Sequence, residues 1–490
     1  MTRLTKEDFF ALAVFALAIG LRFMDLSLRP FHHDEGVNGF FLGRLLNEGV
    51  FKYDPSNYHG PTLYYLTAPI SLLFGLSDAS VRGTTALFGV LTVIVLWRLL
   101  SRERPSFALA AALLLAVSPG AVFFSRYFIH ETLFVGFTVF ALASAPFSEH
   151  AQRWRFIVCG LMLGLLFATK ETAFVSVLAV GGGLVMAAWL VSGKSPFDLL
   201  RGAHGYFSSH AEEFLHGFLS FVATAGLLYS SFFRNPEGVL DAFRTFMFWT
   251  KTAVRDHENP WNQHLLWMKE ADPVLLFLGC AGALLALVLR RSFIGVTAAV
   301  WAILIGAAYS IVKYKTPWLG LNILLPLAIC AGYLVSVIAE VVLLSGRLPL
   351  RSVAAAFAIA AAGYSATLSY DLETKRYDDE SHPYLYAHTQ RSFIDFVRLV
   401  EAKASELGRG KETSIAVFAP ENWPLPWYLR AYKNTGYWGE FKSEIHADLF
   451  VASVEQEAVV SMKLGREYDR SKAFNMRGTV NLILYSKRLP

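Results

Sequence analysis

Residues 8–26 read DFFALAVFALAIGLRFMDL, and residues 31–36, FHHDEG, follow a few positions later. The first stretch is long and apolar enough to cross a bilayer as one helix. No small-residue cleavage site follows it, so we expect a retained signal-anchor and not a removable signal peptide. The chain thus opens with a membrane helix whose mouth carries two acids and two histidines.

The rest of the chain repeats this apolar pattern. Of its 490 residues 54% are hydrophobic and 17% charged, and the mean hydropathy is +0.41, more apolar than a soluble protein of this length requires. The sequence predicts an α-helical polytopic membrane protein with about 11 transmembrane helices. We place them at 8–26, 81–100, 106–124, 131–147, 156–171, 172–193, 213–233, 273–289, 293–312, 318–343 and 350–369. The net charge of +5 is modest, and we expect no nucleic-acid partner.

Basic residues near the span ends predict the orientation, because cytoplasmic loops are enriched in Lys and Arg. With a cytoplasmic N-terminus, every inside loop is basic. The residues concerned are Arg3, Lys6, Arg98, Arg102, Arg104, Arg153, Arg155, Lys194, Arg201, Arg290, Arg291, Arg347 and Arg351. External loops 27–80 and 234–272 and the tail from Tyr370 then lie outside.

The tail differs in character from the apolar part. It carries a charged helical segment at 388–407 and β-type runs at Ile415–Phe418, Leu449–Val451 and Leu482–Tyr485. This alternation predicts one extracytoplasmic α/β domain. We therefore expect two domains, a membrane domain at 1–369 and a soluble domain at 370–490.

The acidic pair Asp34–Glu35 is the first candidate for chemistry, because ionisable groups at the mouth of a span are costly unless solvated or used. In one interpretation a carboxylate acts as general base toward an incoming hydroxyl, while the other orients a partner or a cation. In the other, Asp34 caps an amphipathic helix at 35–48, with Glu35 at the positive end of its dipole. The two interpretations are compatible.

Two further external features carry polar groups. The turn His59-Gly60-Pro61 precedes Tyr64, and His59 either contacts substrate or belongs to an interfacial aromatic belt. Arg126 and His130 share a helical face next to Glu131. Arg126 can meet a phosphate there, or an Arg–Glu pair can stabilise the hairpin.

Lysines at the external span ends break the expected charge pattern. Lys170 interrupts a continuous apolar run, and its alternative role is a Lys–Glu pair that closes a hairpin. Lys313 and Lys315 follow the span at 293–312. With Arg126 they predict a positively lined pocket for a lipid phosphate or pyrophosphate.

The loop 234–272 adds Arg255, His257 and His264 to the external polar residues. Together with His32, His33 and His59 these histidines suggest a metal, but their spacings match no standard ligand pattern. We therefore favour solvated loop histidines, and a divalent metal stays open. The residues expected to contact substrate are His33, His59, Tyr64, His130, Glu131, Arg255 and His257.

The order of these motifs resembles a known superfamily. The motifs are Asp34-Glu35, His59-Gly60-Pro61 with Tyr64-Tyr65, Val81-Arg82-Gly83, Ser125-Arg126 and Thr169-Lys170-Glu171. They resemble those of the GT-C polyprenyl-phosphate-dependent glycosyltransferases, in the branch of protein O-mannosyltransferases and lipid A aminoarabinose transferases. Within that branch, the chain is most similar to prokaryotic membrane proteins described as flippase-activity-associated. The tail stretches YLYAHT at 384–389 and WPLPWY at 423–428 share this similarity.

The resemblance implies a GT-C-like fold and inverting transfer of a sugar from a polyprenyl-phosphate donor to a glycan, protein or lipid acceptor. It places the protein in the cytoplasmic membrane of a prokaryote, with the reaction on the outer face. It makes Asp34 the base, Glu35 its partner, and Arg126 and Lys170 neighbours of the donor phosphate. The His59-Gly-Pro turn replaces a Lys-Pro turn of the aminoarabinose enzymes, so donor contacts do not carry over there. The alternatives are a lipid-linked saccharide flippase, which favours mid-membrane charges and broken helices, and a non-catalytic assembly partner.

Overall fold

The computed structural model describes residues 6–57, 59–147, 150–252, 259–346 and 348–489. The chain divides into two compact units, each built from two segments. Unit 1 comprises Met1–Leu26 and Leu45–Lys375, and unit 2 comprises Ser27–Arg44 and Arg376–Pro490. Each unit is considered by itself below.

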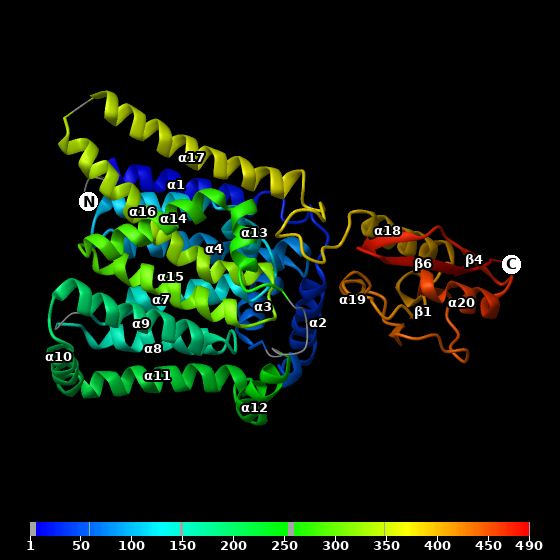
Figure 1. Cartoon of the computed structure of the whole chain (residues 1–490). Helices are drawn as coiled ribbons and strands as arrows, with labels where there is room; N and C mark the ends of the chain where they lie inside the picture. The colour runs from blue at the N-terminus through cyan, green and yellow to red at the C-terminus, as the bar shows by residue number, and fades with distance from the viewer. Residues whose placement is uncertain (1–5, 58, 148–149, 253–258, 347, 490) are drawn as a thin grey trace. The chain divides into compact units, whose positions relative to one another are not determined.

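Unit 1 is a bundle of helices (Figure 1). The α-helices that lie wholly within it are α1 (Lys6–Phe23), α3 (Thr62–Phe74), α4 (Asp78–Leu100), α5 (Pro105–Val117), α6 (Pro119–Ser125), α7 (Glu131–Ser144), α8 (Arg153–Phe167), α9 (Ala173–Ser192), α10 (Pro196–Ser209), α11 (Ala211–Tyr229), α12 (Glu237–Thr252), α13 (Gln263–Ala271), α14 (Pro273–Leu289), α15 (Phe293–Ile311), α16 (Leu321–Leu344) and α17 (Leu348–Thr374). Two 3-10 turns are η1 (Pro55–Asn57) and η2 (Pro317–Gly320). Helix α2 (His33–Glu48) crosses the division between the units.

The polytopic helical fold is confirmed, since each of the eleven predicted spans coincides with a helix. By length and composition, five of the described helices can cross a membrane, and up to seven spans result if two bent pairs count as one each. The bent pairs are α5–α6, at 61°, and α13–α14, at 118°. The predicted span 106–124 is therefore not one straight helix.

Both breaks meet at Asp272, which the sequence did not single out. Asp272 lies between α13 and α14, and its carboxylate accepts hydrogen bonds from Ser118 Oγ at 2.8 Å and Gly120 N–H at 2.7 Å. Ser118 and Gly120 belong to the start of α6, where Pro119 ends the ladder of α5. The buried carboxylate thus satisfies a backbone N–H and a hydroxyl group at the α5–α6 break.

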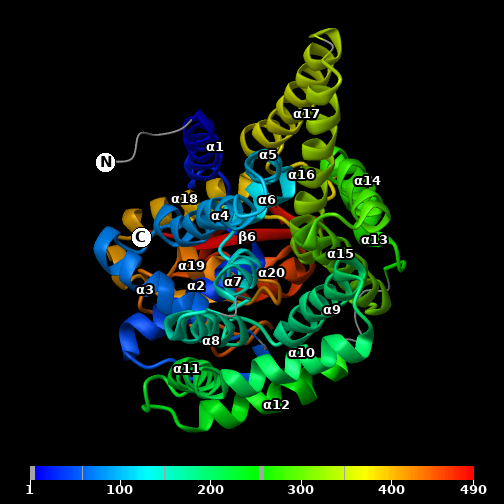
Figure 2. The same ribbon diagram turned by 90° about the vertical axis from the view of Figure 1, so that its left-hand side faces the viewer.

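Small residues let the spans approach closely. A Cβ on Gly160 of α8 would lie 2.0 Å from the carbonyl oxygen of Gly217 in α11, and one on Gly282 of α14 would lie 1.9 Å from that of Cys330 in α16. Backbone contact at such positions is the usual basis of helix association in lipid. Viewed from the α10 end in Figure 2, the helices stand side by side, with α17 at the margin of unit 1.

The charged residues of unit 1 mark two opposite ends of the bundle. At one end Arg104 pairs with Glu340 at 2.6 Å, and Arg153 pairs with Glu212 at 2.8 Å. At the other end Lys170 pairs with Glu131. We call these the arginine end and the lysine end. They match the inside and outside predicted from the loops, although the orientation in a membrane stays a prediction.

Unit 2 contains a six-stranded sheet in the order β2-β1-β3-β6-β4, with β5 also paired to β6. The strands are β1 (Ile415–Val417), β2 (Thr435–Tyr437), β3 (Leu449–Ser453), β4 (Tyr468–Arg470), β5 (Phe474–Arg477) and β6 (Val480–Lys487). The helices are α18 (Ser392–Glu406), α19 (Leu425–Tyr428) and α20 (Glu457–Leu464), with 3-10 turns η3 (Gly410–Glu412) and η4 (Val454–Gln456). The three predicted strands and the helix predicted at 388–407 are confirmed.

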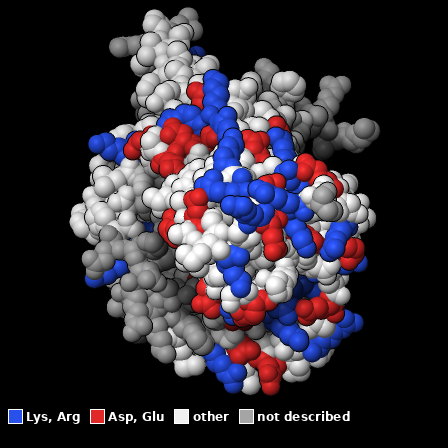
Figure 3. All heavy atoms as spheres, turned by 90° about the vertical axis from the view of Figure 1, so that its right-hand side faces the viewer, with Lys and Arg blue, Asp and Glu red and all other residues white. Residues whose placement is uncertain are grey.

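Alternation along the strands gives unit 2 a core on both faces of the sheet. In β1, Ile415 and Val417 pack on one face with Phe393 of α18, while Ala416 faces the other with Val460 of α20. Lys and Arg intermingle with Asp and Glu over the face seen in Figure 3. Buried strands under a surface of mixed charge are typical of a domain folded in water.

Residues 27–44 pack with the tail, which differs from the division expected from the sequence. The ring of Phe31 stacks on that of Trp427 with centroids 4.7 Å apart, and the Phe31 N–H donates to the Tyr428 hydroxyl oxygen at 2.9 Å. A Cβ on Gly39 would lie 2.4 Å from Trp427 Cε3. The predicted boundary at 369/370 also falls inside α17. These aromatic contacts join residues almost 400 positions apart, so no local sequence pattern in either segment predicts them.

Trp427→Ala should release residues 27–44 from the tail. Trp427 is buried, and truncation of a buried Trp costs about 3–5 kcal/mol of folding free energy. We expect trypsin to cut after Arg44 in the folded variant much faster than in the wild type. Trp438→Ala, on the other face of the sheet, is the control and should leave this site protected. Equal cleavage of both variants would contradict the assignment.

Candidate active site

The acidic pair lies in the first turn of α2, within unit 2. Glu35 is fully buried, and its Oε2 accepts the backbone N–H of His32 at 3.0 Å. His32 Nδ1 in turn accepts the backbone N–H of Asp34 at 3.0 Å. This reciprocal arrangement is a capping box, in which His32 and Glu35 satisfy the helix start. The alternative that Asp34 caps the helix is wrong by position.

Asp34 is therefore the carboxylate that the helix start does not require as a cap. Its side chain is half-buried, whereas Glu35 is wholly enclosed. A carboxylate that accepts a proton from an incoming hydroxyl has to be reachable. Of the two acids, Asp34 has the exposure for that role, and Glu35 has the contacts of a structural residue.

Arg477 of β5 lies beside this turn. Its Nη2 donates to Glu421 Oε2 at 2.6 Å and lies 3.3 Å from His33 Nδ1, while Nη1 donates to the Trp423 carbonyl at 2.6 Å. Burial lowers the pKa of His33, Asp34 acts to raise it, and Arg477 lowers it further. His33 thus lies between an acid that favours its charged form and a guanidinium that disfavours it. Sequence reasoning missed Arg477 and Glu421, since nothing near either of them points to α2.

His32 makes unit 2 sensitive to acid. Its neutral ring accepts from Asp34 N–H through Nδ1 and lies 3.0 Å from the Tyr386 carbonyl through Nε2, so a second ring proton would face a donor. Burial, with the charges of His33 and Arg477, holds the pKa of His32 well below its ordinary value. Below pH ~6.5 the unfolded chain therefore binds the proton that the folded chain refuses, and stability falls as the pH falls.

His32→Asn tests this, because Asn still caps the helix but does not titrate. Between pH ~6.5 and ~5 the free energy of unfolding of the wild type should fall by up to about 1.4 kcal/mol per pH unit more steeply than that of the variant. Urea unfolding followed by tryptophan fluorescence measures both slopes. Parallel slopes would rule out His32 as the titrating group.

Unit 1 brings three of the sequence motifs together at its lysine end. Lys170 Nζ lies 2.5 Å from Glu131 Oε1, and the two side chains are only 4% and 2% exposed. His59 Nδ1 lies 3.2 Å from Glu171 Oε2, and the His59 and His130 rings are 4.8 Å apart. We call Lys170, Glu131, His59, Glu171 and His130 the lysine cluster.

The turn at residues 59–62 is fixed against the link between α8 and α9. Gly60 N–H donates to the Thr169 carbonyl and Thr62 N–H to the Ala168 carbonyl, both at 3.1 Å. A Cβ on Gly60 would lie 2.1 Å from the Ala168 oxygen, so only glycine fits. Tyr64, one turn into α3, is buried with its ring 5.6 Å from that of His130. The sequence predicted that these residues lie on the same, external side of the membrane. The structure places them close together.

Arg126 has a buried carboxylate partner instead of an open face. Its Nε lies 2.7 Å from Glu373 Oε2, Nη1 donates to the Leu21 carbonyl at 3.0 Å, and Nη2 donates to the Asp25 carbonyl at 3.3 Å. It therefore ties the ends of α1 and α17 to the α6–α7 link. If Arg126 binds a phosphate, the phosphate and Glu373 must share its guanidinium group.

The remaining predicted residues differ in burial and in contacts. Lys315 is buried and donates through Nζ to the carbonyls of Ser310 and Val312, closing the end of α15, while Lys313 is exposed. His264 is buried beside the Thr316 carbonyl at 3.2 Å. Arg255 and His257 lie outside the described residues. Among the described residues, His, Cys, Asp and Glu form no group of three or more that suits a metal ion.

Besides Asp272, the buried charges Arg22 and Glu373 of unit 1 also escaped the sequence analysis. Arg22, within the first apolar stretch, donates to the carbonyls of Ala116 at 2.9 Å and Leu115 at 3.2 Å at the end of α5. Glu373, the partner of Arg126, lies near the end of α17. A basic residue inside an apolar stretch was a visible signal for Arg22. Glu373 stood in a charged segment and gave none.

The comparisons with known proteins match part of the chain to a family and nearly all of it to a known fold. Residues 58–204, which contain the whole lysine cluster, match the family model described as dolichyl-phosphate-mannose-protein mannosyltransferase. No curated protein matches the chain in sequence. The crystal structure of ArnT from Cupriavidus metallidurans in the apo state aligns with a TM-score of 0.67 at 15% identity, over 98% of each chain.

Two other structures extend the comparison. ArnT of the same organism bound to undecaprenyl phosphate aligns with a TM-score of 0.64 at 16% identity, over 97% of each chain. The S. cerevisiae protein O-mannosyltransferase Pmt1–Pmt2 complex bound to the sugar donor reaches a TM-score of 0.38 at 19% identity, over 49% of this chain and 36% of that one, too low to compare folds. The resemblance drawn from the motifs is confirmed: the chain is a multi-pass membrane protein with the GT-C fold of ArnT throughout, and its residues 58–204 match the mannosyltransferase family.

Proposed function

We propose that this protein is a membrane glycosyltransferase that uses a polyprenyl-phosphate sugar donor. The observation that carries the proposal is that the two acids of the pair lie in different environments. Glu35 and His32 hold the start of α2 rigidly, and Asp34 is left half-exposed on it. A scaffold shared with an undecaprenyl-phosphate-binding protein supports the donor class.

In the proposed reaction Asp34 removes the proton of an acceptor hydroxyl. The hydroxyl oxygen attacks the anomeric carbon from the face opposite the phosphate, and the bond between that carbon and the phosphate oxygen breaks. The polyprenyl phosphate leaves with the electron pair, so the anomeric configuration inverts. The developing negative charge on the phosphate needs nearby cations. We assign that stabilisation to Lys170, Arg126, Lys313 and Lys315 at the lysine end of unit 1.

The remaining roles are those of binding and placement. We propose that His33, His59, Tyr64, His130 and Glu131 contact substrate, with Arg255 and His257 on the loop 234–272. The acceptor is a glycan, a protein or a lipid. The protein is proposed to lie in the cytoplasmic membrane of a prokaryote, with the N-terminus inside and the tail outside.

A flippase for lipid-linked saccharides is the second candidate, because two observed features favour it. Both α5–α6 and α13–α14 are broken helices, and Asp272 links the two breaks. Broken helices near a buried charge are typical of transporters.

One assay separates the two candidates. The purified protein is reconstituted into liposomes with a radiolabelled polyprenyl-phosphate sugar and a mixture of candidate acceptors. Formation of labelled acceptor supports the transferase. Movement of the labelled lipid between leaflets without any labelled acceptor would reject the transferase in favour of the flippase.

A further inference from the structure

An apolar groove lies between α17 and the helices it covers, within unit 1. Its volume is about 310 Å³, and α5, α14, α16 and α17 line it. Its α17 wall includes Ala354, Ala358 and Ala361, whose side chains are small, together with Phe357. Figures 1 and 2 both show the first half of α17 leaning away from the bundle.

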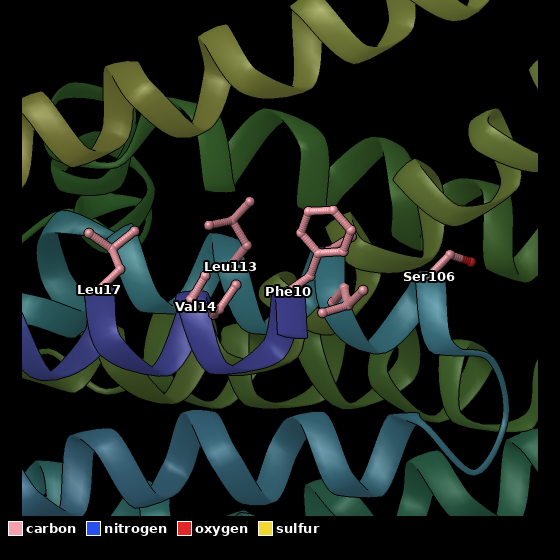
Figure 4. Close-up of a pocket in the computed structure, with 8 residues that line it drawn as sticks. Phe10, Val14, Leu17, Ser106 and Leu113 are labelled. Atoms are coloured by element: carbon pink, nitrogen blue, oxygen red, sulfur yellow. The ribbon is translucent and has the colours of Figure 1, made fainter. Parts of the chain in front are cut away.

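A second groove runs along α5 next to the first. Its volume is about 400 Å³, and residues of α1 and α5 line it, among them Phe10, Leu17 and Ser106 (Figure 4). Ala110 and Leu113 line both grooves, so α5 is their common wall. Unit 1 thus has two adjacent apolar grooves, and α5 separates them.

Both grooves start at the arginine end of the bundle. Phe10 and Ser106 lie in the first turns of α1 and α5, and Arg351 lies in the first turn of α17. The α17 wall extends from Arg351 to Ala362, a rise of about 17 Å at 1.5 Å per residue. This length is close to half of a hydrocarbon core of ~30 Å, and therefore to the depth of one leaflet.

Arg351 supplies a positive charge where the groove beside α17 begins. Its Nη2 donates to the Leu343 carbonyl at 2.8 Å, and its buried Nε finds no hydrogen-bond partner among the described residues. Arg104, at the same end, is already paired with Glu340 at 2.6 Å. Arg351 is therefore the cation of this groove, and a phosphate is a group it can bind at the membrane surface.

We propose that the two grooves hold the two acyl chains of one anionic diacyl phospholipid, whose phosphate binds Arg351. A polyprenyl phosphate has a single chain and would fill only one groove. The site lies at the arginine end, whereas the lysine cluster lies at the opposite end, so it is separate from the proposed donor site. Because α17 also carries Glu373, the partner of Arg126, the lipid braces a helix that the lysine end depends on.

Native mass spectrometry of the full chain in detergent tests the affinity. The probes are phosphatidylglycerol, phosphatidylcholine with the same acyl chains, and undecaprenyl phosphate. The wild type should bind phosphatidylglycerol about tenfold more tightly than phosphatidylcholine, because the choline cation of the latter repels Arg351 and offsets the attraction of the phosphate. Arg351→Gln should remove that preference. Arg290→Gln, an exposed cation that lines neither groove, is the matched control and should keep it.

Photolabelling tests the two-chain arrangement. Phosphatidylglycerol with a diazirine in each acyl chain should label peptides from both α1 and α17, and Ala110→Phe, on the common wall, should reduce both signals together. Four results would overturn the proposal: equal binding of the two phospholipids, equal loss in both arginine variants, labelling of one groove alone, or displacement of phosphatidylglycerol by undecaprenyl phosphate. Arg351→Gln changes a half-exposed side chain, so its outcome does not depend on repacking the bundle.

Discussion

Asp34→Asn should lower the rate of sugar transfer by at least about 100-fold, the usual contribution of a positioned general base. Asparagine has the same shape but cannot take a proton from the acceptor. The backbone N–H that donates to His32 stays in place, so the helix start is preserved. The measurement is the initial rate with a radiolabelled polyprenyl-phosphate sugar, together with thermal unfolding to show that the variant is folded.

Glu35→Gln is the matched control for this result. Glutamine can still accept the His32 N–H, so we expect transfer to stay within a few-fold of the wild type. Full activity of Asp34→Asn would end the assignment of a base. An equal loss in both variants would show that the rigid turn matters and not the carboxylate of Asp34.

Lys170→Met should destabilise unit 1 by about 3–5 kcal/mol, because it leaves the Glu131 carboxylate buried without its partner. The two side chains are 4% and 2% exposed and 2.5 Å apart, so water cannot replace the lost contact. The double variant Lys170→Met with Glu131→Gln should recover much of that loss, since no charge stays buried. Thermal unfolding in detergent measures all three proteins.

The exposed pair Arg153–Glu212 provides the control. These side chains are 51% and 65% exposed, and Arg153→Gln should change stability by less than about 1 kcal/mol. If Lys170→Met is no more destabilising than Arg153→Gln, the pair does not hold the cluster. A double variant that is stable yet inactive would support a role of the Lys170–Glu131 pair in the proposed reaction, separate from its structural one.

The sequence predicted what depends on local pattern. Eleven spans were placed from apolar length, and three strands of the tail from short β-branched and aromatic runs, because both signals lie within a few residues. The motif at Thr169-Lys170-Glu171 was found because a lysine in an apolar run is costly wherever it folds. Its alternative role, an ion pair, was also correct in kind, but the partner Glu131 comes from another span.

What the sequence could not predict depends on contacts between distant residues. Arg477 reaches His33 across more than 400 positions, and Glu373 reaches Arg126 across almost 250. Asp272 joins two helix breaks, which a hydropathy profile reads as continuous apolar segments. Likewise, only the structure showed that Glu35 is buried and accepts the His32 N–H, whereas Asp34 is half-exposed.

The stacking of Phe31 on Trp427 also has a consequence for biosynthesis. Residues 27–44 leave the ribosome long before the tail does, and at 5–20 residues per second the ~380 positions between Arg44 and Trp427 take roughly 20–80 seconds to translate. During that interval the nascent α2 carries Asp34 without the aromatic ring that will hold it. A chain that stops before the tail would keep most of its membrane helices and never acquire a fixed base, so completion of synthesis itself switches the proposed enzyme on.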